Sequence, residues 1–167
     1  MNKPFSIIDN LRTIDFLQNI TDSNINELSA LFTLEKIAMG DPISFGEDLP
    51  EKVSILIDGQ VRQLIQHPVS KKTTSLCLYE SNHIIGWSSI QTNSPSELVT
   101  AASDCNLLSI ESKKWEETLI TFPNILKELN KNVNPTDLWA ILSSLDNLNR
   151  IRIPDKPKEL KQWFRDL

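Results

Sequence analysis

The dipeptide Asp58-Gly59 constrains the fold of this chain more than any other feature, because it lies between two short β-rich runs. The run Lys52–Ile57 precedes it and the run Gln60–Ile65 follows it. An Asp-Gly pair between such runs is the strongest short-range signal of a hairpin, in which both central residues take positive φ. The sequence therefore predicts an antiparallel hairpin at this point.

The hydrophobic period changes on both sides of this hairpin. From Phe5 to about Phe32 the apolar residues recur at helical spacing, and Thr21 is a candidate N-cap for the second of two short helices. Between Leu34 and Ile110 the pattern indicates short strands separated by turns, and after Ser112, a second candidate cap, it becomes helical again. Pro123 is suited to open a further helical turn. We expect a mainly β protein with flanking helices, an antiparallel sandwich, roll or barrel. The further expected strands are 73–79, 98–102 and 106–110.

The length of 167 residues suits one domain with some excess. We assign residues 1–134 to a β-roll with its N-terminal helices, and residues 135–167 to a C-terminal helix and a docking or linker tail. Pro135 is suited to the first turn of that helix, which would run to about Leu145. Two prolines and too little helix follow Asp137 for a helix-turn-helix, so DNA binding is not expected.

Charge and hydropathy exclude several other classes. The formal net charge is −5 and the basic residues do not cluster, which argues against a nucleic-acid-binding surface. No apolar run approaches the roughly 20 residues of a membrane span, and the N-terminus has no apolar core of a signal peptide. Cys77 and Cys105 lie in strand-like stretches and are interpreted as buried, reduced thiols. A cytoplasmic protein without direct membrane insertion is expected.

Catalytic chemistry finds no support in the sequence. The two histidines, His67 and His83, have no second histidine at metal-ligand spacing and are interpreted as surface or turn residues. No serine lies in a Gly-x-Ser-x-Gly elbow, and Cys105 is interpreted as a packing residue. The carboxylates of Glu47, Asp48 and Glu51 are expected to be solvated on a turn. We therefore predict a protein that is not an enzyme and that holds no metal or cofactor.

The four glycines support a more specific interpretation. Met39–Glu47 contains a Gly-Asp-x-Ile step and a Gly-Glu turn, and Val53–Val61 contains an Ile-x-x-Gly-x-Val step. Ile85-Gly86 and the run Val99–Cys105 follow in the same order. Over about residues 10 to 130 this pattern resembles the cyclic-nucleotide-binding family, a β-roll of the Crp/Fnr type. The resemblance implies a regulatory domain with a phosphate-binding cassette beginning at Gly86.

The cassette of this chain departs from the family pattern. In the family a Glu directly after the glycine receives the ribose hydroxyl, the amides of a short helix face the cyclic phosphate, and an Arg followed by Ser or Thr and Ala completes the site. Here Trp87 follows the glycine, and counting back from Val99 puts Pro95 at the arginine position. Ser96 then stands at the hydroxyl position and Glu97 at the alanine position. The resemblance places a degenerate nucleotide pocket at the following residues: Gly86, Trp87, Ser88, Ser89, Ser96 and Glu97.

Losing the arginine removes charge-assisted, bidentate hydrogen bonds to phosphate, and such a loss costs about 2–5 kcal/mol. No Arg or Lys lies between Lys72 and Lys113, and Glu97 brings a like charge towards the anion. We therefore expect a vestigial pocket in a non-catalytic regulatory or interaction module. The alternative is a small-molecule sensor that binds a cyclic nucleotide or another metabolite. Trp87 is expected to fill the pocket, and the alternative is that it stacks on a neutral aromatic ligand.

A narrower resemblance involves two segments, Ile85–Ile90 and Ser94–Ser103. They are similar to the degenerate cyclic-nucleotide-binding-like domain at the N-terminus of some cyanobacterial peptide- or protein-secreting ABC transporters. This resemblance implies the regulatory head of a transporter. The chain itself has no Gly-x-x-x-x-Gly-Lys-Ser/Thr loop.

The C-terminal region supplies the expected output surface. One apolar helical face contains Leu138, Ile141, Leu142 and Leu145, and Trp139 lies beside it. Trp163 and Phe164 end a tail that is otherwise rich in Lys and Glu. Such aromatic residues often anchor contacts between proteins. Leu138, Trp139, Leu142, Trp163 and Phe164 are predicted to dock a protein partner, a second copy or a following domain, the alternative being that they fold back on the β-roll.

Overall fold

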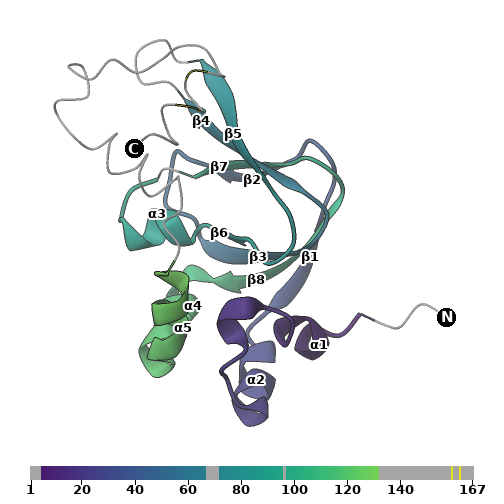
Figure 1. Cartoon of the computed structure of the whole chain (residues 1–167), viewed down its shortest axis with the longest axis vertical. Coiled ribbons are helices and arrows are strands. Elements are labelled where there is room, and N and C mark those ends of the chain that lie inside the picture. Colours follow the sequence, from purple (N-terminus) through teal and green to yellow (C-terminus); the bar gives the residue numbers. More distant parts are fainter. Residues whose placement is uncertain (1–4, 67–71, 96, 132–158, 160–161, 163–167) are drawn as a thin grey trace.

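Two antiparallel sheets face each other and form a roll (Figure 1). The computed structural model describes residues 5–66, 72–95, 97–131, 159 and 162. The strands in these residues are β1 Thr33–Ile37, β2 Pro42–Phe45, β3 Lys52–Asp58, β4 Val61–Gln66, β5 Thr73–Tyr79, β6 Ile84–Ile85, β7 Leu98–Ala101 and β8 Cys105–Glu111. The first sheet has the order β1-β8-β3-β6 and the second the order β2-β7-β4-β5.

The first sheet is buried on both faces, and the alternation of its side chains explains how. Val53 and Ile55 of β3 pack with the helices on the outer face, whereas Leu56 packs against the second sheet. On β8, which pairs antiparallel with β3, Leu108 faces the helices and Leu107 faces the roll interior. Strands buried on both faces carry near-continuous apolar runs. The core is therefore divided into a helical cluster and a roll-interior cluster.

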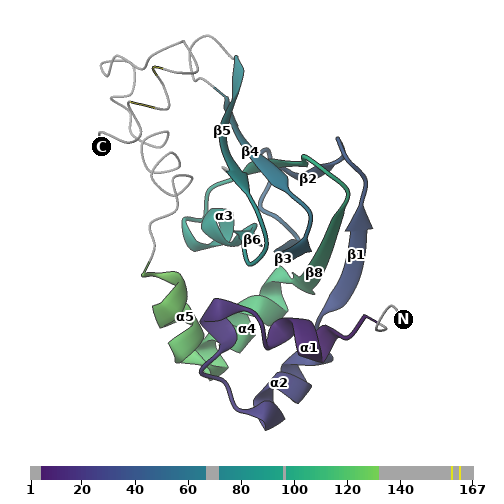
Figure 2. The same cartoon turned by 45° about the vertical axis from the view of Figure 1, so that its right-hand side comes forward.

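The helices lie on one side of the roll, apart from a short one at its edge (Figures 1 and 2). Their bounds are α1 Ile7–Leu11, the 3-10 helix η1 Asp15–Leu17, α2 Asp22–Ser29, α3 Trp87–Gln91, α4 Ser112–Thr121 and α5 Pro123–Leu129. α3 connects β6 to β7, while the other helices pack beneath the first sheet. The buried indole of Trp115 on α4 lies at the centre of this helical cluster.

The helix boundaries confirm two of the three predicted signals. The hydroxyl of Thr21 accepts a hydrogen bond from the amide of Asn24, 3.4 Å away, and so caps α2. Pro123 is the first residue of α5. The predicted cap of α4 was wrong: Glu111 is the N-cap residue, and the Ser112 hydroxyl donates to the carbonyl of Pro50 at 2.5 Å. The hydrogen bond of the Ser112 hydroxyl therefore connects the start of α4 to the loop before β3.

The predicted hairpin at Asp58-Gly59 is also wrong, because β3 and β4 belong to different sheets. Only Gly59 of the pair has positive φ, at 96°, so the turn is not of the hairpin type. The Gln60 amide donates to the Ser103 hydroxyl, and the Gln60 carbonyl accepts from the Ala102 amide. The Asp-Gly pair therefore turns a corner from the first sheet to the second.

The predicted boundary between residues 134 and 135 and the predicted helix from Pro135 lie outside the described residues. The same holds for the predicted contact residues Leu138, Trp139, Leu142, Trp163 and Phe164. None of the described helices has the length and apolar composition that a membrane crossing requires.

Candidate functional site

The predicted cassette begins where β6 ends, at Gly86. This residue is the N-cap of α3 and has φ 90° and ψ −20°. A Cβ at this position would lie 2.8 Å from the carbonyl oxygen of Lys52, so both the conformation and the close approach of β3 require glycine. The glycine thus fixes the start of α3 against the first sheet, as the resemblance implied.

Ser89 and Glu97 form a buried contact at the start of α3. The Glu97 side chain is 0% exposed, and its Oε2 accepts a hydrogen bond from the Ser89 amide at 3.3 Å. The Ser89 hydroxyl accepts in return from the Glu97 amide at 3.1 Å. Ser89 is the third residue of α3, and its amide is among those that a helix leaves without an intrahelical partner. The resemblance implies that the amides of this short helix face a phosphate. Here one of them, the amide of Ser89, donates its hydrogen bond to the carboxyl group of Glu97 instead.

A third segment joins this contact. The Ser44 hydroxyl on β2 donates to the Glu97 carbonyl oxygen at 2.6 Å. Ser44 and Ser89 are both buried. Glu97 thereby connects β2, α3 and the start of β7, which gives it a structural role that does not depend on a ligand.

Trp87 packs on the helical side of the first sheet, and the expectation that it fills the predicted pocket stays a prediction. Trp87 is half-buried and packs with the helical cluster, where its ring meets that of Trp115 edge-on, with centroids 6.5 Å apart. It does not line the cavity in the roll interior. The first side chain of α3 points towards the helices because the left-handed conformation of Gly86 redirects the chain there. Trp87 thus stands at the family's ribose-binding position without facing the roll interior.

The structure brings together Gly86, Ser88, Ser89 and Glu97, with Ser88 and Ser89 both buried. Pro95 is exposed, and Ser96 lies outside the described residues. None of these residues carries a positive charge. Ser89 and Glu97 are therefore in contact, and the amide of each donates to the side chain of the other.

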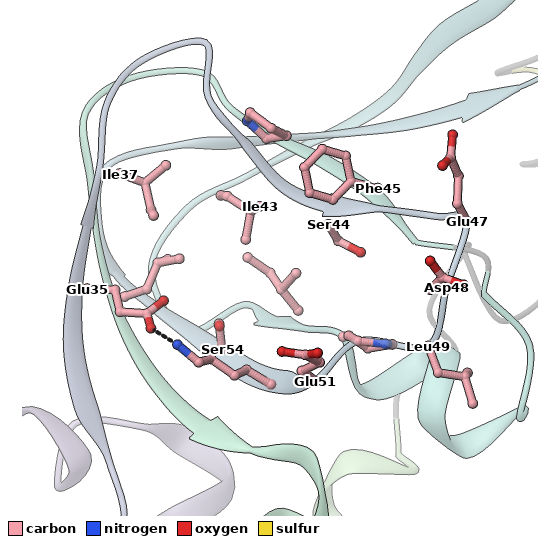
Figure 3. A pocket seen from close by; sticks show the side chains of 16 residues that line it. Glu35, Ile37, Ile43, Ser44, Phe45, Glu47, Asp48, Leu49, Glu51 and Ser54 are labelled. Carbon is pink, nitrogen blue, oxygen red and sulfur yellow. Dashed lines mark hydrogen bonds and ion pairs between the residues drawn. The ribbon is translucent and has the colours of Figure 1, made fainter.

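A cavity of about 520 Å³ lies between the two sheets, beside the loop that joins β2 to β3 (Figure 3). Its inner surface includes Ile85 and Leu107, which are buried in the roll-interior cluster. Ile37 and Ile43 pack against the same cluster. Of the predicted cassette residues that the structure describes, only Gly86 lines this cavity.

The floor of the cavity carries a chain of hydrogen bonds. The hydroxyls of Ser54 and Ser109 are 2.8 Å apart, and the Ser109 hydroxyl donates to Oε2 of Glu35 at 3.1 Å. Oε1 of Glu35 forms an ion pair with the ammonium group of Lys52 (Figure 3). The hydrogen bond and charge of Glu35 raise the pKa of Lys52, which stays protonated at neutral pH.

Sequence reasoning missed this cavity. It placed Glu47, Asp48 and Glu51 on a solvated turn, and all three are exposed as expected, but it did not indicate that they also line the cavity. The available signal was a pair of serines, Ser54 and Ser109, inside otherwise apolar strand patterns. Buried hydroxyls on two paired strands indicate a polar patch in the roll interior.

The remaining predicted polar residues fit structural roles. Cys105 is buried, Cys77 is half-buried, and both are free thiols. His83 is half-buried rather than at the surface, and its ring stacks on that of Tyr79 with centroids 3.6 Å apart. His67 lies outside the described residues. Among the residues that the structure describes, no group of His, Cys, Asp and Glu side chains could hold a metal ion.

Comparison with known proteins supports the fold and not the ligand. No family model matches the chain, and no curated protein matches it. Solved structures do match. The regulatory subunit of a cAMP-independent protein kinase A from Trypanosoma brucei has a TM-score of 0.69 and 16% identity, over 80% of this chain and 48% of that one. The corresponding Trypanosoma cruzi subunit, bound to guanosine, has a TM-score of 0.71 and 16% identity, over 86% and 49% of the two chains.

A bacterial structure matches over its whole length. A cyclic-nucleotide-binding protein from Geobacter metallireducens, so described in its structure report, has a TM-score of 0.61 and 16% identity, over 83% of this chain and 98% of that one. The chain spans about half the length of the kinase subunits. The predicted fold class, an antiparallel β-roll with flanking helices of the cyclic-nucleotide-binding type, is therefore confirmed. At these identities the likeness shows the fold alone.

Proposed function

We propose that this chain is a non-catalytic regulatory or interaction module whose inherited cassette does not bind a cyclic phosphate. The buried Glu97 carries the proposal, because its carboxylate accepts the hydrogen bond of the Ser89 amide inside α3. A cyclic phosphate at this place would meet the carboxyl group of Glu97 at the family's alanine position and would find Pro95 at its arginine position. Trp87, packed against Trp115, supplies no acceptor for a ribose hydroxyl.

Titration calorimetry tests this proposal directly. Cyclic AMP and cyclic GMP are expected to bind no tighter than about millimolar, near −4 kcal/mol. A micromolar constant for either would overturn the vestigial assignment and favour the sensor. The variant with both Pro95→Arg and Glu97→Ala adds the missing cation and removes the like charge, and we expect it to bind cyclic AMP at least about tenfold tighter.

One structural neighbour gives this design a precedent. A triple mutant of the Trypanosoma brucei subunit was solved bound to cAMP in its A site. The control is Glu97→Ala alone, which lacks the cation and should not gain affinity. Equal gains from the single and the double variant would show that the missing arginine does not limit binding.

The second candidate is a sensor of an uncharged ligand. The guanosine-bound Trypanosoma cruzi subunit supports it, because a nucleoside carries no phosphate and needs no arginine. Guanosine and adenosine therefore belong in the same calorimetric series. Micromolar binding of either, without binding of the cyclic nucleotides, would establish this alternative.

The proposed output is a protein contact made by the C-terminal region. The apolar face of Leu138 and Leu142, with Trp139, Trp163 and Phe164, supports a docking partner, a second copy or a following domain. The Ile85-Gly86-Trp87 step supports a narrower proposal, that the module is the regulatory head of a cytoplasmic transporter component. Finding the gene beside, or fused to, an ABC transporter would support that proposal, and a context without any transporter would count against it.

A further inference from the structure

The cavity beside the β2–β3 loop is distinct from the cassette. It shares only Gly86 with the described residues of the predicted cassette, and β1, β2, β3 and β8 supply most of its wall. Its volume of about 520 Å³ lies within the range of roughly 300–1,000 Å³ typical of small-molecule sites. The chemistry of its lining therefore defines the ligand that it can accept.

Negative charge dominates this lining. Four carboxylates line the cavity, those of Glu35, Glu47, Asp48 and Glu51, and Lys52 is the one cation among the lining residues. Four carboxylates and one ammonium group give these lining residues a formal net charge of −3 at neutral pH. Lys52 is paired with Glu35, so the other three carboxylates carry this net charge. Such a lining attracts a cation and repels a phosphate or carboxylate ligand.

Apolar side chains make up the rest of the wall. Ile85 and Leu107 are buried at the inner end. Phe45 and Leu49 lie at the edge of the cavity and are 66% and 43% exposed, a large exposure for apolar side chains (Figure 3). A ligand with an apolar body would cover both, and the gain would be of the usual hydrophobic kind.

Two hydrogen bonds and an ion pair hold the floor of the cavity. Glu35 is held by the Ser109 hydroxyl on one oxygen and by Lys52 on the other, and Ser109 is held by Ser54. Because Glu35 is already paired, the exposed carboxylates of Glu51 and Asp48 are the ones left to contact a ligand. The described residues offer no cluster able to hold a metal ion, which favours an organic cation over an inorganic one.

We propose that this cavity binds a small organic amine, with its ammonium group at the Glu51 and Asp48 carboxylates and its apolar body between Phe45, Leu49 and Ile85. The inference goes beyond the proposed function, because amine binding here is independent of whether the α3 cassette binds a cyclic nucleotide. Figure 3 shows the carboxylate of Glu51 beside Ser54 and Asp48 on the β2–β3 loop.

The test is an NMR titration of the full chain with three ligands of similar size. Phenethylamine is the probe, 3-phenylpropionate is the anionic control and 2-phenylethanol is the neutral control. We expect phenethylamine to shift the amides of Ser54, Ile85 and Gly86 with saturation near or below about 1 mM. The propionate should produce no saturable shift, and the alcohol should bind more weakly than the amine. Raising the salt concentration should weaken amine binding.

Variants identify the charges that matter. Glu51→Gln is expected to weaken amine binding about threefold, and the double variant with Asp48→Asn about tenfold, the range of exposed ion pairs. Glu116→Gln on the exposed face of α4 is the matched control and should leave binding unchanged. Both cavity substitutions are at the surface end of the loop, and unchanged spectra without ligand would show that the fold is intact.

Three results would overturn the amine site. They are no saturable shift with phenethylamine, equal or tighter binding of the propionate, and amine binding that Glu51→Gln and Asp48→Asn leave unchanged. Cyclic AMP added to a separate sample tests the proposed function on its own. Amine failure without cyclic AMP binding would leave the proposed function standing.

Discussion

Gly59 and Gly40 have nearly the same backbone conformation and very different surroundings. Their φ values are 96° and 93°. A Cβ on Gly59 would lie 2.4 Å from the carbonyl oxygen of Asp104 and 2.9 Å from Sγ of Cys105, whereas a Cβ on Gly40 would have no neighbour within 4 Å. The corner between the sheets therefore excludes a side chain at Gly59 by contact as well as by φ.

The matched pair Gly59→Ala and Gly40→Ala separates these two effects. Gly40→Ala is expected to lower the free energy of unfolding by about 1–2 kcal/mol, the strain of a left-handed alanine. Gly59→Ala should lower it by more than about 3 kcal/mol, because the backbone of Asp104 must also move. Urea unfolding at pH 7 measures both. Equal losses would show that close packing at the corner has no effect of its own.

The connection between β5 and β6 is held by an aromatic stack. Tyr79 is the last residue of β5, and His83 precedes β6 with its ring at an interplanar angle of 6° to the tyrosine. The His83 carbonyl accepts from the Leu56 amide at 2.9 Å. Burial lowers the pKa of His83 to about 4, so the imidazole is neutral in the folded protein at neutral pH.

This burial predicts a loss of stability in acid. Between pH 6.5 and pH 4 the unfolded chain binds a proton at His83 and the folded chain does not, so stability falls as the pH falls through that window. The full effect is about 3 kcal/mol. His83→Phe keeps a flat ring for the stack and removes the titration. The difference in unfolding free energy between the two proteins should change over this window. A constant difference would mean that the pKa of His83 is not lowered.

α3 and α4 are joined by two tryptophans. Trp87 opens α3, and its ring meets Trp115 of α4, which also contacts Phe16 and Phe32 edge-on. Such edge contacts add about 0.5–1.5 kcal/mol each beyond the area they bury. A displacement of α3 would therefore change the packing of Trp115 on α4. α4 is followed by α5, the last described helix before the C-terminal region.

Among the residues that the structure describes, the folded core lies within residues 7 to 129. Every residue of the helical and roll-interior clusters described above falls in this range. Deleting residues 147 to 167 should therefore leave a folded, soluble domain and abolish assembly with a partner or a second copy. Circular dichroism tests folding, and sedimentation or partner capture tests assembly.

Two outcomes of the truncation would contradict the prediction of a folded domain that no longer assembles. Unfolding of the shortened protein would make the tail part of the core. Undiminished assembly would place the contact surface elsewhere. The double variant Trp163→Ala and Phe164→Ala keeps the full length and should reduce assembly without loss of helical signal.

Local signals in the sequence predicted most elements because they act within a few residues. Thr21 and Pro123 need only their own helices, and the β-roll followed from the order of the glycines. The assignment of β3 and β4 to one hairpin failed because Asp-Gly indicates a turn without indicating which strands pair across it. That choice depends on β8, which pairs with β3 from about 50 residues further along the chain.

The sequence indicated residues that lie near one another but not the directions of their side chains. Gly86, Ser89 and Glu97 lie together as expected, but the sequence did not indicate that the Glu97 carboxylate turns towards an amide of α3. The sequence also did not indicate that the Trp87 ring packs against Trp115, because that contact joins α3 to a helix far along the chain. The cavity was missed because its walls come from strands far apart in the sequence.

The buried Glu97 also affects how such a domain can change over evolutionary time. Replacing it with the family's alanine removes the acceptor of a buried amide, at a cost of about 1–3 kcal/mol, before any ligand offers compensation. An arginine gained first at position 95 would help a phosphate only after the carboxylate had gone. Single mutations towards nucleotide binding at these two positions would therefore be deleterious or neutral, and only the two together would favour a phosphate.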